Sequence, residues 1–231
     1  MSTLYIIGTP IGNLGDISFR AVEILKSVDL VACEDTRRTL KLMSHLGLRI
    51  PLLSCRAQNE GFAAEKVIAF LKEGKTVAYA SDAGTPGVSD PGAILVRFAA
   101  EAGHAVIPIP GPSAFASLVS VAGGIDKSVV FEGFLSPKSG RRRSRLKELL
   151  TMETAFVLYE SPFRVLKLLE DLADLDSERY ICVGREMTKV HEEYLRGSVR
   201  EVLFVLQEKN KQIGEFSVYV SGKKINNRVN Y

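Results

Sequence analysis

Apolar and polar positions alternate in short blocks through the first half of the chain. The short apolar runs predict strands at residues 4–7, 30–33, 76–80 and 105–108. Segments with apolar residues at a helical spacing predict helices at residues 19–26, 36–46, 62–71, 93–102 and 113–121. Glycine follows most of these helices, which is typical of helix ends. Strands that alternate with helices indicate βαβ units and a mainly parallel sheet.

The pattern changes after Gly123-Gly124, which we interpret as a domain boundary. Beyond it, apolar runs predict strands at residues 129–134, 155–159, 180–183, 194–197 and 216–220. Amphipathic segments predict helices at residues 141–150, 165–172 and 199–206. Ser161 and Pro162 have the residue types expected at the N-cap and the first position of a helix. We therefore expect an α/β protein with a mainly parallel N-terminal domain, a mixed C-terminal sheet and a polar tail, over residues 1–122, 125–222 and 223–231.

Glycine- and proline-rich loops follow predicted strands at residues 8–13, 81–92 and 110–114. Glycine lets a backbone approach a ligand closely, and proline stiffens a loop, so such loops suit a preformed pocket. Ligands of open α/β sheets bind at the carboxyl ends of the strands, where these loops begin. Tight turns are the alternative, but the 81–92 loop is long for a simple connection and carries two aspartates. Neither a P-loop nor a GxGxxG fingerprint is present.

Charged residues gather in three further segments. Residues 33–38 place two carboxylates and two guanidinium groups at a strand end, although a helix N-terminus also favours acidic residues. In the 159–164 segment, helix capping leaves Glu160 and Arg164 unexplained. Residues 185–193 are dense in charge and are a further candidate for function, whereas a solvated surface is the alternative. His191 has no second His or Cys at a metal-ligand spacing, so no metal site is predicted.

The composition is that of a globular protein, with 46% hydrophobic and 25% charged residues. A net charge of +3 is too small to indicate a polyanionic partner by itself. Cys33, Cys55 and Cys182 form no CxxC pair, and so few thiols suit a reducing cytosol. We find no signal peptide and no apolar stretch near the ~18 residues of a membrane span, so we expect a cytoplasmic protein without a membrane partner.

A compact basic run lies in and before the predicted 141–150 helix. Its members are Lys138, Arg141, Arg142, Arg143, Arg145 and Lys147, with no acidic residue before Glu148. Such a cluster suits the phosphate backbone of a nucleic acid, whereas an ordinary solvated helix face is the alternative. No aromatic residue interleaves with the run, so the sequence does not indicate base stacking of the kind found in RNA-binding sheets.

The chain resembles the ribosomal RNA small subunit methyltransferase I family of the tetrapyrrole methylases. The resemblance is carried, in order, by the blocks at residues 8–13, 33–37, 81–92, 110–114, 159–164 and 185–193. It extends from Leu4 to about Val220, nearly the whole chain. The 81–92 block is very specific, whereas the 110–114 block is shared more loosely with cobalamin- and sirohaem-pathway methylases.

This resemblance implies a two-domain tetrapyrrole-methylase fold, a homodimer, and S-adenosylmethionine bound in a cleft between the domains. The implied substrate is a cytidine in the decoding region of 16S ribosomal RNA or of the small ribosomal subunit, methylated on its ribose 2′-oxygen. The positions implied to line the cofactor from the first domain are Pro10, Asp82, Ala83, Gly84, Thr85, Ser113 and Ala114. Those implied from the second are Tyr159, Gly214 and Glu215.

The chain departs from the family pattern at three places. Phe163 stands where His is usual, and Ser136 stands where Pro is usual. Residues 55–58 read Cys-Arg-Ala-Gln in place of a His-rich stretch. These departures argue against a histidine general base.

Transfer of a methyl group from a sulfonium requires in-line placement of the acceptor oxygen and gains from a base. The carboxylates at strand ends are candidates for that base: Glu34, Asp35 and Glu160. The candidate RNA contacts are Arg37, Lys138, Arg141, Arg142, Arg143, Arg145 and Arg164.

Other functions stay open at this point. A methyltransferase of the same fold could act on a small molecule such as a tetrapyrrole, although the basic run and the 33–37 block disfavour it. A nucleotide-dependent NTPase or dehydrogenase would carry fingerprints that are missing here. A non-catalytic RNA-binding module would not need three loops of the cofactor type.

Overall fold

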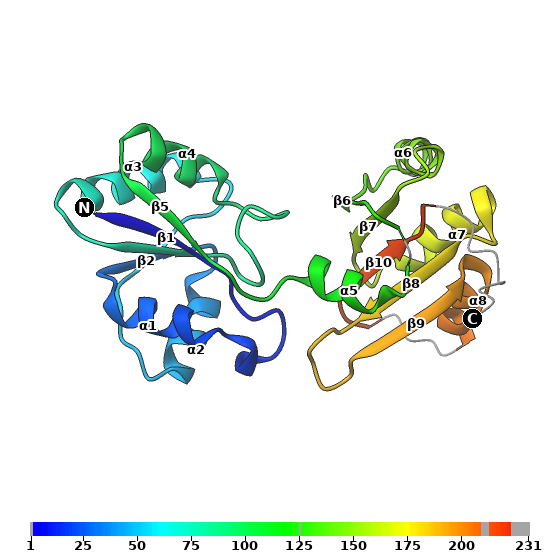
Figure 1. Cartoon of the computed structure of the whole chain (residues 1–231), viewed down its shortest axis with the longest axis horizontal. Helices are drawn as coiled ribbons and strands as arrows, with labels where there is room; N and C mark the ends of the chain where they lie inside the picture. Colours follow the sequence, from blue (N-terminus) through cyan, green and yellow to red (C-terminus); the bar gives the residue numbers. More distant parts are fainter. Residues whose placement is uncertain (1, 125, 209–212, 223–231) are drawn as a thin grey trace. The chain divides into compact units, whose positions relative to one another are not determined.

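The computed structural model describes residues 2–124, 126–208 and 213–222. The chain divides into two compact units, the first ending at Ser113 and the second beginning at Ala114 (Figure 1). The boundary predicted at Gly123-Gly124 lies one helix further along the chain. The predicted 223–231 tail lies outside the described residues. None of the helices within the described ranges is long and apolar enough to cross a membrane.

The first unit is a parallel sheet with helices on both faces. Its strands are β1 (Thr3–Ile7), β2 (Leu30–Cys33), β3 (Leu52–Ser54), β4 (Val77–Ala80) and β5 (Ala105–Ile109). They are ordered β3-β2-β4-β1-β5, and each neighbouring pair is parallel. Its helices are the 3-10 turn η1 (Leu14–Asp16), α1 (Phe19–Ser27), α2 (Thr36–His45), α3 (Glu60–Lys72) and α4 (Ala93–Glu101). The predicted parallel α/β unit is confirmed.

Side-chain alternation on β4 shows how the two faces are covered. Val77 and Tyr79 pack with α3 and α4 in one apolar cluster. Ala78 and Ala80 pack with α1 and α2 in another. Because successive strand residues point to opposite faces, a strand buried on both sides needs apolar residues at every position, as β4 has.

The sequence pattern missed β3, the edge strand of this sheet. The strand has only 3 residues, none of them fully buried, and it pairs with β2 alone. A run this short carries no measurable periodicity, so only pairing with its neighbour defines it.

The second unit is built on a mixed sheet, as predicted. Its strands are β6 (Val129–Phe134), β7 (Ala155–Glu160), β8 (Tyr180–Arg185), β9 (Glu193–Ser198) and β10 (Phe216–Val220). The order is β6-β7-β10-β8-β9, in which β6 and β7 are parallel and the other pairs antiparallel. Its helices are α5 (Ala114–Ala122), α6 (Ser139–Thr151), α7 (Val165–Asp176) and α8 (Val199–Glu208).

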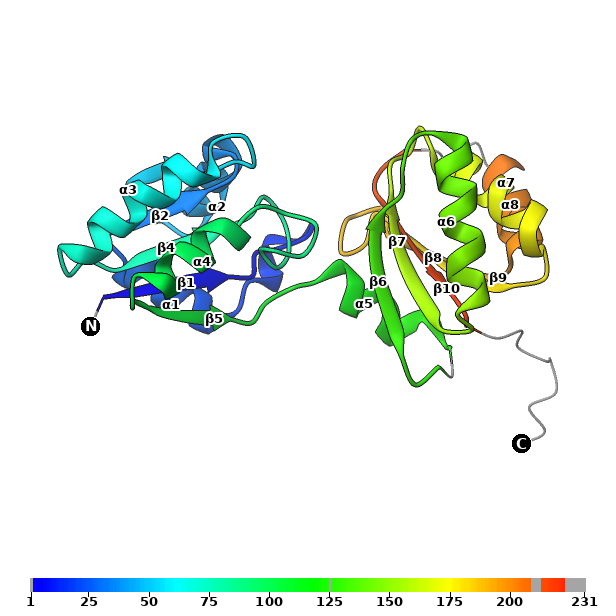
Figure 2. The same ribbon diagram turned by 90° about the horizontal axis from the view of Figure 1, so that it is seen from above.

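The helices of the second unit cover its sheet unequally. The apolar core lies between the sheet and α6, α7 and α8, and α5 covers the opposite face (Figure 2). The α5 helix is fixed to the sheet where its Ala122 carbonyl accepts a hydrogen bond from the Tyr180 hydroxyl at 2.7 Å. Leu118 approaches Gly184 of β8, where a side chain would collide with it and with Met187. These contacts explain why α5 belongs to the second unit.

The helix predicted at residues 165–172 is α7, and it begins at Val165 as expected, but the predicted N-cap is wrong. Ser161 does not cap the helix, which begins at Val165. Instead, the Ser161 carbonyl accepts hydrogen bonds from the backbone N–H groups of Arg164 and Val165, both at 3.1 Å. The 161–164 segment is therefore a tight turn between β7 and α7.

Glu60 fastens α4 to α3 in the first unit. Its side chain is buried, with the residue only 6% exposed. Its Oε1 accepts hydrogen bonds from the backbone N–H groups of Gly92, Ile94 and Leu95, at 2.9, 2.8 and 3.2 Å. These donors have no partner within their own helix, so one carboxylate satisfies the N-terminus of α4 and stabilises it through the helix dipole.

We predict that Glu60→Ala lowers the free energy of unfolding by about 2–3 kcal/mol, because it leaves buried backbone N–H groups at the start of α4 without an acceptor. Glu60→Gln keeps an acceptor oxygen and should cost less. Urea unfolding of each variant measures the change. Glu65→Ala, on the exposed side of the same helix, is the control and should differ from wild type by less than about 0.5 kcal/mol. Equal loss of stability in Glu60→Ala and Glu65→Ala would contradict the role assigned to Glu60.

Candidate functional site

The three glycine- and proline-rich loops meet at the carboxyl edge of the first sheet. The loop after β1 and the loop after β4 form a backbone bridge, in which Thr9 and Gly84 exchange N–H to carbonyl hydrogen bonds of 2.9 and 3.0 Å. The end of β5 joins them, because the Gly8 N–H donates to the carbonyl of Ile109, its last residue, at 3.1 Å. The Thr85 hydroxyl also donates to the Pro112 carbonyl at 3.4 Å. The edge is therefore one connected assembly.

Glycine is required where these loops cross. A Cβ on Gly8 would lie 2.8 Å from the Gly111 Cα, and a Cβ on Gly111 would lie 2.5 Å from the Gly8 carbonyl oxygen. The two backbones therefore lie in direct contact, with no room for a side chain between them. Gly84 has a φ of +82°, which L-residues with a side chain rarely adopt. The glycines noted in the sequence thus serve close backbone approach rather than isolated turns.

A cavity of about 230 Å³ opens at this edge. The loop after β1 contributes Thr9 and Pro10, and the loop after β4 contributes Ser81 and Asp82. The first half of α2 supplies Arg38 from the other side. Of the positions implied to bind the cofactor, Pro10 and Asp82 line this cavity, and Ala83, Gly84 and Thr85 continue the same loop. Ser113 is the last residue of the unit.

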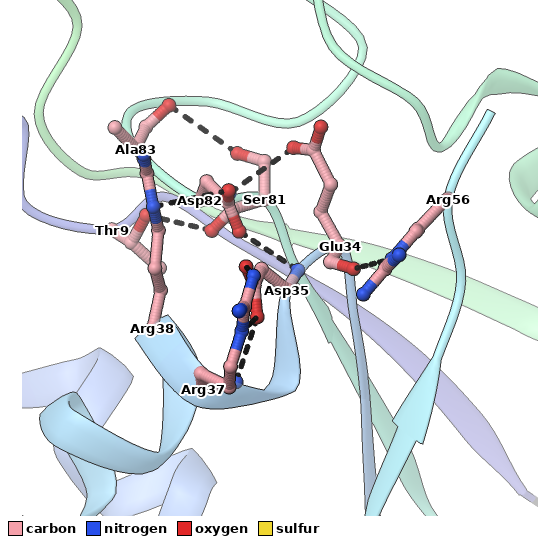
Figure 3. A network of polar contacts seen from close by, with 9 residues as sticks. All are labelled: Thr9, Glu34, Asp35, Arg37, Arg38, Arg56, Ser81, Asp82 and Ala83. Atoms are coloured by element: carbon pink, nitrogen blue, oxygen red, sulfur yellow. Dashed lines mark hydrogen bonds and ion pairs between the residues drawn. The ribbon is translucent and has the colours of Figure 1, made fainter.

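The charged end of β2 is tied to the loop after β4 through Asp82 (Figure 3). Asp82 Oδ1 accepts a hydrogen bond from the Asp35 backbone N–H at 2.8 Å, and its Oδ2 lies 3.5 Å from Arg38 Nε. The Asp82 N–H in turn faces Glu34 Oε2 at 3.5 Å. The 33–38 and 81–92 blocks are therefore parts of one site.

Asp35 is occupied by structural contacts. It is the N-cap of α2, where its Oδ1 accepts from the Arg37 N–H at 2.9 Å, and its Oδ2 binds Arg37 Nη2 at 2.7 Å. Hydrogen bonds from the side chain and backbone of Arg37 hold the pKa of Asp35 well below its usual range. A carboxylate with so low a pKa is a weak base. The helix N-terminus considered as the alternative for residues 33–38 therefore accounts for Asp35.

Glu34 is the better placed of the two neighbouring carboxylates. It is half-buried, and Arg56 Nε binds its backbone carbonyl at 3.2 Å rather than its carboxylate. Burial, followed by the charge of Asp82, raises the pKa of Glu34 above its ordinary value. A carboxyl group whose pKa is raised toward neutrality is more effective in general base catalysis.

Asp90 belongs to the same acidic group, and the sequence reasoning missed it. It lies at the far end of the 81–92 loop, with the Ser81 hydroxyl within hydrogen-bonding reach. Burial, followed by the charge of Glu34, raises the pKa of Asp90 to about 6. The sequence signal was the second aspartate of the loop, but only folding brings residues 34, 82 and 90 together.

Glu160 forms a closed ion pair in the second unit. The residue is 3% exposed, and its Oε1 binds Arg164 Nη2 at 2.6 Å and the Ser161 N–H at 2.7 Å. This pair explains both residues that helix capping left unexplained. Its carboxylate is engaged in these contacts, and the role of Glu160 as a catalytic base stays a prediction. Arg164, predicted to contact RNA, is likewise held by Glu160.

The remaining implied cofactor positions lie at separate places in the second unit. Ala114 begins α5, and Tyr159 packs edge-on against Phe131, with ring centroids 5.0 Å apart. Gly214 has a φ of +104° and lies against Glu186, whose Oε1 accepts a hydrogen bond from the Glu215 N–H at 2.9 Å. Glu186 thus fixes the 214–215 segment.

The basic run of α6 is partly consumed by ion pairs. Arg142 is buried and binds Asp171 at 2.7 Å. Arg143 binds Asp171 and Asp174, at 2.8 and 2.7 Å. The structure contradicts the predicted RNA contact at Arg142, because a buried guanidinium paired with a buried carboxylate cannot meet a phosphate.

Other members of the run differ in how free they are. Arg145 holds Glu132 through two hydrogen bonds of 2.8 Å and also contacts Glu148. Lys138, Arg141 and Lys147 are exposed and have no carboxylate partner within the described part of the chain. In the first unit, Arg37 is exposed over 83% of its side chain although it pairs with Asp35.

No group of three or more His, Cys, Asp or Glu side chains in the described ranges is arranged to hold a metal ion. Cys33, Cys55 and Cys182 are buried and unbridged. Burial raises the pKa of each of these thiols. They are apolar packing residues rather than reactive groups.

We predict that Asp90→Asn stabilises the protein near neutral pH. The pKa of Asp90 is about 6 in the folded protein and about 3.9 in the unfolded chain. The fold therefore favours the protonated carboxyl, and the contribution of Asp90 to stability is full at low pH and is lost as the pH rises through about 6. After discounting for partial exposure, the variant should gain about 1 kcal/mol at about pH 7.5 and nothing near pH 4. Urea unfolding at both pH values tests this, with Asp16→Asn as the control. A gain independent of pH would refute it.

Solved structures with the same fold are tetrapyrrole methyltransferases. Cobalt precorrin-4 methyltransferase, a cobalamin biosynthetic enzyme, is 17% identical, with a TM-score of 0.67 over 95% of this chain and 94% of that one. Uroporphyrin-III-C-methyltransferase of Thermus thermophilus is 15% identical, with a TM-score of 0.66 over 96% of this chain and 95% of that one. At such identities the likeness shows the fold alone. Residues 3–203 match the family model of the Tetrapyrrole (Corrin/Porphyrin) Methylases.

Much nearer relatives carry one name. The ribosomal RNA small subunit methyltransferase I of Borrelia garinii subsp. bavariensis is 47% identical over 94% of this chain and 98% of its own. That of Thermotoga maritima is 44% identical over 97% of this chain and 100% of its own. The fold, the joined loops and these identities lead to one conclusion: the chain belongs to the tetrapyrrole methylases and, within them, to the ribosomal RNA small subunit methyltransferase I family.

Proposed function

We propose that this chain is an S-adenosylmethionine-dependent methyltransferase that modifies the ribose 2′-hydroxyl of a cytidine in the decoding region of small-subunit ribosomal RNA. The observation that carries the proposal is the joined loop edge of the first unit, in a chain 47% identical to a named ribosomal RNA methyltransferase. Action as a homodimer in the cytoplasm remains a prediction from family resemblance.

The first unit fits S-adenosylmethionine in backbone shape and charge. Where Gly8 and Gly111 cross, neither residue carries a side chain, so a ligand could approach the backbone closely there. The carboxylates of Glu34, Asp82 and Asp90 complement a positive group. When bound, the cofactor supplies an activated methyl group on a sulfonium. Pro10 and the 82–85 segment would hold it here, whereas Tyr159 and the 214–215 segment stay predictions from resemblance.

Glu34 would accept the proton of the acceptor 2′-hydroxyl, while the cofactor would supply the methyl group from its sulfonium and leave as a neutral thioether. Its carboxylate has no ion-pair partner in the described part of the chain, and its raised pKa suits a base. Arg38 and Asp82 fix the surrounding backbone, which orients the acceptor. Orientation can contribute up to roughly 7–11 kcal/mol, so we assign it the larger share of the rate and the base a smaller one.

A tetrapyrrole or similar small molecule is the alternative acceptor, because both solved neighbours described above act on such compounds by name. Their identity to this chain is 17% and 15%. The exposed cations Lys138, Arg141 and Lys147 favour RNA, since a polyanion needs unpaired positive charge. Methylation of uroporphyrinogen by the purified protein would favour the alternative.

The function is tested with small ribosomal subunits that lack the modification and with radiolabelled S-adenosylmethionine. We expect label on a cytidine ribose of the decoding region, mapped by nuclease digestion and mass spectrometry. Glu34→Gln should lower kcat by about 10²-fold or more. The rate should also rise with pH through the raised pKa of Glu34, because the base must be ionised.

Glu65→Gln, an exposed glutamate of α3, is the matched control and should keep wild-type turnover. Wild-type turnover in Glu34→Gln would remove Glu34 as the base. Cofactor binding without any labelled RNA would contradict the proposed substrate and leave the small-molecule acceptor.

A further inference from the structure

A row of aromatic rings runs through the second unit toward one edge of its sheet. Phe115 meets Phe131 with ring centroids 5.3 Å apart, Phe131 meets Tyr159 at 5.0 Å, and Tyr159 meets Phe134 at 5.8 Å. Each contact is edge-on, which is favourable for aromatic pairs. The row ends at Phe134, the last residue of β6, which is 57% exposed.

A second exposed phenylalanine lies at the same edge. Phe163 is in the turn that follows β7, and it is 90% exposed. Because β6 and β7 are parallel and Phe134 lies opposite Tyr159, both strands end at the edge that carries Phe134 and Phe163. This phenylalanine adds nothing to the core, so its exposure is not explained by stability.

The turn that carries Phe163 is held firmly. Glu160, which is buried, binds both the Ser161 N–H at 2.7 Å and the Arg164 guanidinium at 2.6 Å. The Ser161 carbonyl also accepts from the Arg164 N–H at 3.1 Å. The Phe163 backbone is therefore fixed on both sides before any partner binds, which lowers the entropic cost of an interaction there.

Unpaired positive charge follows Phe134 directly. The chain turns from Phe134 into α6, where Lys138 is the N-cap and Arg141 lies in the first turns. Both are exposed, and neither has an ion pair within the described residues. Arg142, Arg143 and Arg145, in contrast, are bound to carboxylates. The unpaired cations of the run are therefore Lys138 and Arg141 at its start and Lys147 further along. Its start is the part of the run nearest to Phe134 in sequence.

We propose that Phe134 and Phe163 form a stacking platform for unpaired nucleobases of the RNA substrate, with Lys138 and Arg141 contacting the phosphates beside them. This inference rests on the proposed function, since it names how the same substrate is held. Single-stranded RNA is recognised by aromatic stacking combined with positive charge, because every base has a π-face and every linkage a phosphate. The sequence pattern showed no such interleaving, because Phe163 reaches this edge only through the pairing of β6 with β7.

Binding of an unpaired RNA oligonucleotide, measured by fluorescence anisotropy, tests the platform. We expect Phe163→Ala and Phe134→Ala each to raise Kd about tenfold, the loss of one stacked base. Phe163→Trp should bind like wild type, whereas Phe163→Leu, which is apolar but cannot stack as well, should resemble Phe163→Ala. Wild type and Phe163→Ala should bind an oligonucleotide with abasic sites with the same Kd, because it offers no base to stack. The double variant Lys138→Ala/Arg141→Ala should weaken the binding of both oligonucleotides.

Phe204→Ala is the matched control, because Phe204 is also exposed, at 63%, but lies on α8. It should bind RNA like wild type, and Phe163→Ala should keep the cofactor affinity of wild type by calorimetry. Wild-type RNA affinity in Phe163→Ala, or full affinity in Phe163→Leu, would overturn the platform even if ribosomal subunits are methylated. Conversion of a dimer to a monomer by Phe163→Ala, seen by sedimentation, would instead assign this surface to a second copy of the chain. Failure of the wild-type protein to methylate subunits would refute the proposed function separately.

Discussion

The close approach of Gly8 and Gly111 is the constraint on which the functional edge of the first unit depends. It brings the loops after β1 and β5 into backbone contact, and the Thr9–Gly84 bridge adds the loop after β4. Because β2 and β4 are paired and end side by side, the same loop after β4 also brings Asp82 to Asp35, Arg38 and Glu34. The parallel order of β4, β1 and β5 makes the crossing possible, since it puts their carboxyl ends side by side. Fold and site are thus fixed by the same few backbone contacts.

Ion pairing decides which charged residues are available for function. Glu160 and Asp171 are buried carboxylates, and each takes arginines that the sequence offered as RNA contacts. Removing one partner of such a pair would leave a buried charge, so these arginines serve the fold. What remains exposed and unpaired in the described part of the second unit includes Lys138, Arg141 and Lys147. Burial and the charge of Asp82 raise the pKa of Glu34, whereas hydrogen bonds from Arg37 lower that of Asp35.

Much of the fold could be predicted, because it is written in local patterns. The strand that became β4 is apolar throughout, and α1 begins at Phe19, where the helical spacing of apolar residues predicted it. The edge strand β3 and the turn at residues 161–164 could not be predicted, since they depend on pairing with β2 and on the buried Glu160. At the site, sequence found the loops but neither the role of Asp90 nor the loss of Arg142 to Asp171. Spacing along the chain does not indicate that Arg142 will meet Asp171, which lies 29 residues away.

The central claim is that the joined loops form the cofactor site, and Gly111→Ala tests it most directly. Its methyl group would meet the Gly8 carbonyl oxygen, whereas Gly140→Ala, where a Cβ meets nothing within 4 Å, is the control. Calorimetric titration with S-adenosylmethionine should show binding to wild type and to Gly140→Ala. It should show affinity weaker by about tenfold or more in Gly111→Ala, because backbone contacts to the ligand are displaced. Unchanged affinity in Gly111→Ala, or no binding to the wild-type protein, would contradict the account.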